Sequence, residues 1–469
     1  MLLIRNILYL VLSILLFHCS ESEYKNPCDP TSQNFLKLLL FKRFTSDTAS
    51  LCGLNTSNLF GTNSLSNFSY APDLYYANGA SISLSPTVSS SGLTFSISPS
   101  LPGGISLNTS TGKITGSYVG YGGSSFTYTV QASNSSGSIS TSFKLSIFGK
   151  NPIQTMQSQC WNVSGTLDAS CTAGTSIGQD GQLKKGTTPS FTGPSLVGST
   201  DYITTDNNTG LIWKSCFEGR SGATCIGTLS SLNATTAAST CTSLNSGLGY
   251  ANRTDWRLAS FGETNTILNH IGTSPATFTS NFPSASGGGT WSSTGDVSNS
   301  ANAWYISFTD GTIGSTVKTN TNDVHCVSGS SLPAAQFVDN GDDTIVDINT
   351  GLIWQKCTNG LSGSSCQTGT ATQMNWASAL TVCNGLSLNG KTWRLPNINE
   401  LKTIIDVTTS SPSTNTTFFP VTQLGNYWTS STYTTTSAAW VVPFGASTFY
   451  ATNLSKSSNA YTRCVTTGP

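Results

Sequence analysis

The stretch DINTGLIWQKC (Asp347–Cys357) repeats DNNTGLIWKSC (Asp206–Cys216), which lies 141 residues earlier, with eight of eleven positions identical. Further pairs of phrases recur in the same order: DWRLASFGE at Asp255 and TWRLPNINE at Thr392, GTWSS at Gly289 and NYWTSS at Asn426, NAWYISFTDG at Asn302 and AAWVVPFGAS at Ala438, VHCV at Val324 and TRCV at Thr462. Because the period exceeds the roughly 20–50 residues of solenoid and propeller repeats, the sequence predicts two tandem globular domains, here called the first and second copy.

The cysteines repeat with the same spacing. Successive intervals are 9, 16 and 85 residues in the first copy and 9, 17 and 81 in the second. This regularity predicts a duplicated disulfide-bonded domain and an oxidising compartment. The spacing does not suit a zinc site, and the chain has only three histidines. The predicted disulfides are Cys216–Cys225, Cys241–Cys326, Cys357–Cys366 and Cys383–Cys464, with Cys160–Cys171 and Cys28–Cys52 outside the repeat.

The N-terminus is typical of an exported protein. Arg5 precedes an apolar run, Ile7–Phe17, that is too short to span a bilayer, so residues 1–18 are interpreted as a signal peptide. The run ends in LLFHC, where a lipoprotein signal peptidase would leave Cys19 as the new N-terminus. Cys19 is therefore the predicted lipid anchor, and the alternative is a plain secreted protein. Removing Cys19 from the 13 cysteines leaves an even number to pair.

Composition favours a β-rich exported chain. Charged residues are only 9 % and balance to zero, and 45 residues are glycine. No basic face for nucleic acid or another polyanion is implied. Beyond the leader no stretch is long and apolar enough to cross a membrane, so lipid is the only membrane attachment predicted. The length suggests about three domains.

Local patterns predict the elements within a copy. DDTIVDINTGLIWQK alternates around an Asn-Thr-Gly turn, as a β-hairpin does. MNWASALTVCNGL places Trp376, Ala379, Leu380 and Cys383 at helical spacing before an Asn-Gly stop. A second helix is expected after WRLPN. A last-strand Cys464 can then pair with the helix residue Cys383.

The repeated phrases, including GQDGQLKKGTTPSF, TGLIWQK, WRLPNINEL, YWTSS and the final RCV, resemble the C-terminal domain family of the Legionella collagen-like protein. The resemblance covers roughly residues 155–330 and 333–469, and the first copy lacks a counterpart of Pro396. It implies a C-type-lectin-like α+β fold in which the helix cysteine pairs with the last strand. It also implies adhesion or carbohydrate binding rather than catalysis.

A different module lies upstream. GLTFSISPSLPGGISLNTSTGKITGSY (Gly92–Tyr118), followed by FTYTVQASNSSGSISTSFKLSI, resembles an immunoglobulin-like repeat of bacterial surface proteins and implies a spacer. Phe126, Tyr128 and Val130 alternate with Thr127 and Thr129, as sandwich strands do.

The predicted fold is therefore mainly β: an immunoglobulin-like β-sandwich followed by two tandem disulfide-bonded C-type-lectin-like α+β domains. The expected divisions are 1–18 signal peptide, 19–69 lipid-anchored segment and linker, 70–148 immunoglobulin-like domain, 149–332 first lectin-like domain with its lead-in, and 333–469 second lectin-like domain.

Candidates for chemistry are few. His325 has Arg463 as its counterpart, so a base there would not be shared by the copies, and His270 is expected at a helix end. The DNGDD stretch at Asp339 could suit calcium, but lacks the glutamate of an EF-hand and is typical of a turn. Arg394 and Glu400 are interpreted as a structural ion pair, and the repeated tryptophans mainly as core. No enzymatic motif is present, so no catalytic residue, metal or cofactor is predicted, and ligand-binding residues are not identified.

We therefore predict a non-enzymatic adhesin at the outer membrane or cell surface, which recognises an extracellular host, matrix or glycan ligand. The alternatives are a structural envelope lipoprotein without host ligand, or a divergent enzyme on a formylglycine-generating-like scaffold. The Legionella relative is associated with sulfated glycosaminoglycans, but the second copy balances six basic against six acidic residues. Recognition is therefore expected to be insensitive to salt and to use loops around Asn426–Ser431 and Ala438–Tyr450.

Overall fold

The structure is a computed structural model that describes residues 28, 67–135, 137–172, 177–271, 275–283, 285, 287–445 and 449–468. Ser69–Thr87, Thr94–Ala132 and the described residues from Ser140 onward form one compact unit, and the described residues of the other unit are 28, 67–68, 88–93, 133–135 and 137–139. The predictions for the signal peptide, Cys19 and the Cys28–Cys52 disulfide lie outside the described residues. No helix in the described ranges has both the length and the apolar character needed to span a membrane.

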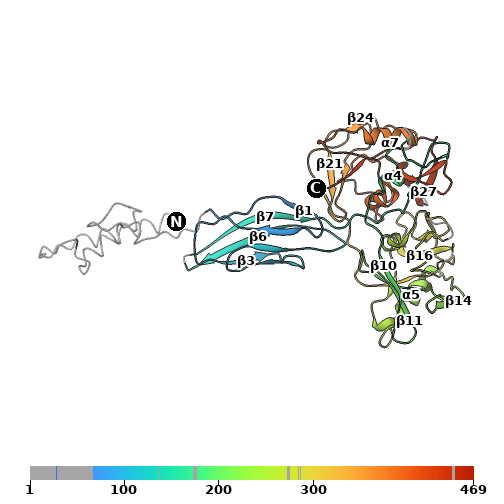
Figure 1. Cartoon of the computed structure of the whole chain (residues 1–469), viewed down its shortest axis with the longest axis horizontal. Coiled ribbons are helices and arrows are strands. Elements are labelled where there is room, and N and C mark those ends of the chain that lie inside the picture. Colours follow the sequence, from blue (N-terminus) through green and yellow to red (C-terminus); the bar gives the residue numbers. More distant parts are fainter. Residues whose placement is uncertain are drawn as a thin grey trace. The chain divides into compact units, whose positions relative to one another are not determined.

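The upstream module is a two-sheet immunoglobulin-like sandwich, as predicted. One sheet, whose strands are labelled in Figure 1, has the order β1-β7-β6-β3, and the other has the order β2-β5-β4. Tyr128 and Val130 face the core between the sheets, whereas Phe126 is 51 % exposed. The strands are β1 (Leu74–Tyr76), β2 (Ser81–Leu84), β3 (Thr94–Ser98), β4 (Ile105–Leu107), β5 (Ile114–Ser117), β6 (Ser124–Asn134) and β7 (Gly137–Ile147).

The two copies have the same order of elements, except that η2 and β15 of the first copy have no counterpart among the elements of the second. In the first copy these are β10 (Phe191–Val197), β11 (Asp201–Asp206), β12 (Ile212–Lys214), β13 (Arg220–Ser221), β14 (Ile226–Gly227), α5 (Ala234–Ser243), η2 (Tyr250–Asn252), β15 (Arg257–Leu258), α6 (Phe261–Thr264), η3 (Asn265–Ile267), β16 (Gly289–Gly295), β17 (Asn302–Ser307), β18 (Ile313–Val317) and β19 (Cys326–Ser328). In the second copy they are β20 (Phe337–Asp339), β21 (Thr344–Asp347), β22 (Leu352–Gln355), β23 (Leu361–Ser362), β24 (Thr368–Gly369), α7 (Trp376–Asn384), α8 (Ile398–Leu401), η4 (Lys402–Ile404), β25 (Asn426–Thr432), β26 (Ala438–Pro443), β27 (Phe449–Ser455) and β28 (Val465–Thr467).

The predicted hairpin and helices form. Strands β21 and β22 pair antiparallel, with Asp347 opposite Leu352 across the Asn-Thr-Gly turn. Helix α7 begins after Asn375, whose side chain caps it, and Gly385 follows its last residue. The four apolar positions predicted for the buried face of this helix are all buried. The short helix α8 follows the Trp-Arg-Leu-Pro phrase and carries a capping box between Asn397 and Glu400.

One six-stranded sheet, β16-β17-β18-β27-β26-β25, passes from the first copy into the second. Its central pair joins equivalent strands of the two copies, β18 and β27, in antiparallel orientation, with Ile313 opposite Ala451. The order is therefore symmetric about this pair, as in an isologous dimer interface. The two copies are therefore arranged like the subunits of a dimer, although they belong to one chain. The domain boundary at residue 333 stays a prediction.

Each face of the shared sheet covers a different core. On one face, Trp304, Ile306 and Phe308 of β17 and its end join Trp440 and Val442 of β26 in a single cluster shared by both copies. On the opposite face each copy has a core of its own: Ala237, Trp256 and Trp291 contribute to the first, and Trp376, Trp393 and Trp428 to the second. The tryptophans named in the sequence analysis are thus core residues.

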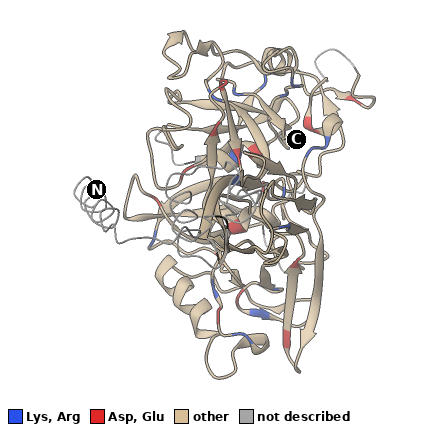
Figure 2. Ribbon diagram, turned by 90° about the vertical axis from the view of Figure 1, so that its left-hand side faces the viewer, with Lys and Arg blue, Asp and Glu red and all other residues tan. Residues whose placement is uncertain are grey.

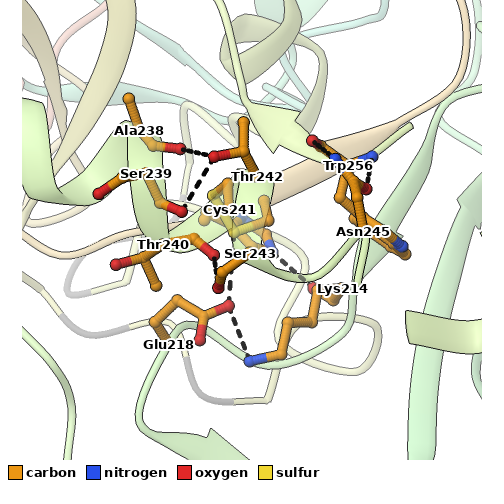
Figure 3. The surroundings of a disulfide bond; sticks show 12 residues. Lys214, Glu218, Ala238, Ser239, Thr240, Cys241, Thr242, Ser243, Asn245 and Trp256 are labelled. Carbon is orange, nitrogen blue, oxygen red and sulfur yellow. Dashed lines mark hydrogen bonds and ion pairs between the residues drawn. A yellow bond between two sulfur atoms is a disulfide. The ribbon is translucent and has the colours of Figure 1, made fainter. Parts of the chain in front are cut away.

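Five disulfides have the predicted pairing: Cys160–Cys171, Cys216–Cys225, Cys241–Cys326, Cys357–Cys366 and Cys383–Cys464. In each copy the long bridge ties the first helix to the last strand. Figure 3 shows Cys241 on α5 near the Lys214–Glu218 ion pair, whose Nζ–Oε1 distance is 2.9 Å, and near Asn245 and Trp256, which exchange two hydrogen bonds. These bridges are typical of exported proteins.

The lead-in, residues 150–187, packs against the second copy although it precedes the first. It contains β8 (Cys160–Trp161), β9 (Leu167–Asp168) and α4 (Asp180–Leu183). The Gln157 side chain bonds both the N–H and the C=O of Thr432, at 3.0 and 2.5 Å. Asp180 accepts from Ser431 Oγ at 2.6 Å, and Lys456 Nζ donates to the carbonyl of Trp161 at 3.2 Å. The edge strand β25 is thereby covered.

Candidate functional site

Of the segments expected to carry recognition in the second copy, Asn426–Ser431 and Ala438–Pro443 are core strands, so the prediction is wrong for them, and residues 446–448 lie outside the described residues. Asn426–Ser431 belongs to β25 and Ala438–Pro443 to β26, and nearly all their side chains are buried. The physical reason is double coverage: the shared sheet has a core on each face, and the lead-in lies over its edge. Alternation of apolar and polar residues, which would have signalled a solvated face, is absent from these strands.

The arginine and glutamate singled out in the second copy form a buried ion pair. Arg394 and Glu400 make a buried bidentate pair with N–O distances of 2.6 Å, and Arg257 and Glu263 repeat it in the first copy. In both copies the glutamate also accepts from the residue that caps its helix. Each pair therefore fixes the Trp-Arg-Leu segment to the helix that follows it, which is the structural role predicted from the sequence.

The histidines and the Asp339 stretch have structural surroundings. His325 is fully buried, stacks on Phe217 with ring centroids 4.1 Å apart, and has its pKa lowered to about 3 by burial. Asp339 accepts from Lys356 Nζ at 2.6 Å and from the N–H of Gly341. In the described part of the chain, no three His, Cys, Asp or Glu side chains gather as metal ligands would.

The first copy has an open basin on the sheet face that also carries its own core, here called the outer face, and the sequence did not reveal it. Its volume is about 450 Å³. Strands β16, β17 and β18 form its floor, and the segment after β18 forms its wall. The lining residues are Gly289, Tyr305, Ser307, Thr312, Thr316, Asn320, Thr321 and Asn322. All are uncharged, and six carry a hydroxyl or amide on a side chain of modest length, with Tyr305 the one aromatic ring. We call this surface the Tyr305 basin.

Two glycines flank the ring of Tyr305, which packs partly against the core of the first copy. Tyr305 lies opposite Trp291 on one neighbouring strand and opposite Gly314 on the other. A Cβ at Gly314 would lie 3.0 Å from the Tyr305 hydroxyl, and one at Gly289 would lie 3.0 Å from Tyr305 Cδ2. Side chains at either position would therefore crowd or cover the ring, which is partly exposed in this structure.

Asn322 adds an unused donor at the wall. Its main chain pairs with that of Leu232 in both directions, so the backbone position is fixed. Its Nδ2 is buried and has no hydrogen-bond partner. Leaving a buried donor without a partner costs about 1–3 kcal/mol, and because this nitrogen has almost no accessible surface, a ligand oxygen would reach it only after the Asn322 side chain turned. Beside it, the Asn320 side chain donates from Nδ2 to Thr316 Oγ1 at 2.7 Å, and both residues line the basin.

The second copy fills the equivalent space. In the repeated phrases Tyr305 corresponds to Val441 and Asn322 to Ala460, and both are at most 1 % exposed. At the start of the first helix, Ala234 is replaced by Trp376, whose Nε1 donates to the carbonyl of Thr429 at 2.7 Å. Among the described residues the basin is thus a feature of the first copy alone. Comparison of the two copies at these positions was the sequence signal that could have revealed it.

Charge plays no part in this surface. Figure 2 shows acidic and basic residues of both signs scattered over the ribbon, without one large cluster of either sign. The charged residues nearest the basin in sequence all have hydrogen-bond partners within the chain. Asp323 accepts from Ser231 Oγ at 2.9 Å, and Lys318 Nζ donates to the carbonyl of Ser300 at 2.8 Å. Asp310 accepts from Tyr433 Oη at 2.7 Å and from Oγ1 of the lining residue Thr312 at 2.8 Å. A ligand there would be recognised by shape, one ring and neutral hydrogen bonds.

Comparisons with known proteins agree with this division. Residues 61–148 match the family described as Putative Ig domain. Residues 202–328 and 343–466 each match the Lcl C-terminal domain family, and together they make up more than half of the chain. No curated protein gives a match.

Two solved structures illustrate the similarities, which cover only about a fifth of this chain. A SusE-like surface located polysaccharide binding protein from the Bacteroides thetaiotaomicron heparin utilisation locus shares 22 % identity over 21 % of this chain and 17 % of its own, with a TM-score of 0.16. The titin M3 domain shares 19 % identity over 17 % of this chain and 95 % of its own, with a TM-score of 0.13. From the family matches to both copies, the chain belongs to the Lcl C-terminal domain family and carries an upstream immunoglobulin-like domain.

Proposed function

We propose that this chain is a lipid-anchored, non-enzymatic adhesin that binds glycans at the cell surface through the Tyr305 basin. The observation that supports it most is that the two copies differ at the position of Tyr305 on the outer sheet face. The second copy closes the outer sheet face with Val441 and Ala460, whereas the first keeps a partly exposed ring between two glycines. A purely structural face has no need of this opening.

The chemistry of the basin suits a neutral sugar. A pyranose ring presents an apolar C–H face and a rim of hydroxyls, each able to donate and accept. The Tyr305 ring offers a flat apolar surface for the first, and the hydroxyl and amide side chains that line the basin offer hydrogen-bonding groups for the second. Because no charged side chain lines the basin, affinity should change little with ionic strength, unlike binding to a polyanion.

The test is binding of the whole exported chain to an array of neutral glycans. Tyr305→Ala should weaken binding to the recognised glycan about tenfold or more, because a lost aromatic contact of about 1.5 kcal/mol corresponds to roughly that factor. Asn322→Ala should weaken binding as well, yet leave the free energy of unfolding unchanged or slightly higher, since it removes a donor that has no partner in the free protein.

Phe126→Ala is the matched control, because Phe126 is an exposed aromatic of the immunoglobulin-like domain. It should bind like the parent chain. Binding that survives both basin variants, or that collapses as salt rises, would contradict the proposal. An array without any hit for the parent chain would favour the alternative of a structural envelope protein.

The lipid anchor rests on the LLFHC phrase at residues 15–19. We expect labelled palmitate to enter the full chain in the producing cell and to be absent from a Cys19→Ser variant, which should also leave the detergent phase. Equal labelling of both chains would remove the anchor from the proposal.

A further inference from the structure

A second cavity, distinct from the Tyr305 basin, lies where the two copies meet. Its volume is about 320 Å³, and its lining comes from both copies, the lead-in, the linker between the copies and Tyr121 of the immunoglobulin-like domain. The residues that matter here are Ser260, Gly262, Asn265 and Thr294 of the first copy and Asn399 and Lys402 of the second. Most other lining groups are apolar or hydroxyl-bearing.

The cavity exists because the lead-in covers only one of two equivalent positions. In the second copy Asn397 Nδ2 donates to the carbonyl of Lys185, and Asn399 Nδ2 donates to that of Ile153, at 3.1 and 2.9 Å. The counterparts in the first copy are Ser260 and Gly262, which reach no such segment and line the cavity instead. Loss of two amide side chains thus opens the space.

Lys402 places a buried amine in this cavity with neutral partners only. It is 6 % exposed, and its Nζ donates to Asn265 Oδ1 at 2.8 Å and lies 3.3 Å from His270 Nε2. Lys402 belongs to none of the ion pairs in the described part of the chain. Burial lowers its pKa to about 7. A buried ammonium without a counter-ion is costly.

No carboxylate of the described residues forms an ion pair with Lys402. Asp347 also lines the cavity, but burial raises its pKa to about 6, and its carboxylate accepts from the N–H of Asn349 at 3.0 Å and from the Thr350 and Thr403 hydroxyls rather than from Lys402. His270 Nε2 lies 3.0 Å from Asn399 Oδ1, so the one nitrogen cannot both donate there and accept from Lys402, and His270 Nδ1 is buried without a partner. Burial holds the pKa of His270 well below its usual value, which keeps the ring neutral.

We propose that this cavity is a binding site for a small carboxylate of about hexuronate size, whose anion pairs with Lys402. Ser260 and Thr294, which line the same space, carry hydroxyls for the polar atoms of such a molecule. A neutral molecule of the same size would leave the ammonium unpaired. The site shares no lining residue with the Tyr305 basin. Because both copies line it, a bound carboxylate would stabilise the contact between them.

The probe is sodium D-glucuronate, with D-glucose as the neutral control of similar size, in calorimetric titrations of the whole exported chain at pH 6. Glucuronate should bind and raise the melting temperature, and glucose should bind at least tenfold more weakly. Lys402→Met should lose the preference for glucuronate.

Asn265→Asp provides a variant that keeps the shape of the site. It places a carboxylate on the atom that already lies 2.8 Å from Lys402 Nζ, so it should melt higher than the parent chain without ligand and bind glucuronate at least tenfold more weakly. Absence of glucuronate binding by the parent chain would overturn the proposal. Equal binding of glucose, or unchanged glucuronate binding by Asn265→Asp, would overturn it too.

Discussion

Replacing both Cys383 and Cys464 by alanine should lower the free energy of unfolding by about 4.5 kcal/mol, because a disulfide stabilises a protein mainly by reducing the entropy of its unfolded chain. The bridge closes a loop with a sequence separation of 81 residues. Both cysteines are fully buried in the core of the second copy, next to Trp393 and Trp428, so the loss of packing adds to the entropic effect. Urea unfolding of the oxidised variants at constant pH measures the change.

The Cys357–Cys366 bridge is the matched control. Its sequence separation is only 9 residues, so the same reasoning gives about 2.6 kcal/mol for the double alanine variant. The difference of about 2 kcal/mol between the two variants is the critical quantity. Equal losses would show that loop closure does not govern the stability of the second copy.

Repetition in the sequence made the disulfides and the local elements predictable. Two cysteine sets with nearly equal intervals admit few pairings that treat both copies alike, and the pairing found is the one predicted. The Asn-Thr-Gly turn between β21 and β22 and the capped helix α7 depend on neighbouring residues, which a single sequence displays directly. The ion pair of Arg394 with Glu400 was likewise suggested by its equal spacing in both copies.

The joining of the copies could not be predicted in this way. Strands β18 and β27 pair through their backbones, and their sequences IGSTV and FYATNLS carry no shared pattern that would indicate an edge meeting its equivalent. The lead-in posed a similar problem: nearness along the chain suggested the first copy, whereas Gln157 and Asp180 contact the second. Burial of β25 and β26 follows from these two long-range contacts.

Removal of the Trp304 side chain should therefore destabilise both copies, although Trp304 belongs to the first. Its ring stacks on that of Tyr450 in the second copy, with centroids 3.9 Å apart, inside the core that the copies share. A buried tryptophan replaced by alanine typically costs about 3–5 kcal/mol. Since the loss falls on the common core, we expect scanning calorimetry to show the transition of the two copies moving to lower temperature as one.

Hydrogen exchange distinguishes this from a local effect. In Trp304→Ala, amides of α7 in the second copy should exchange faster along with those of α5 in the first, because global opening of the pair becomes more frequent. Leu248→Ala, at a side chain that is 83 % exposed, should change stability by no more than about 0.5 kcal/mol and leave both helices protected. If α7 kept its protection in Trp304→Ala while α5 lost it, the copies would be independent in stability, and the six-stranded sheet would be a contact between two domains rather than the centre of one folding unit.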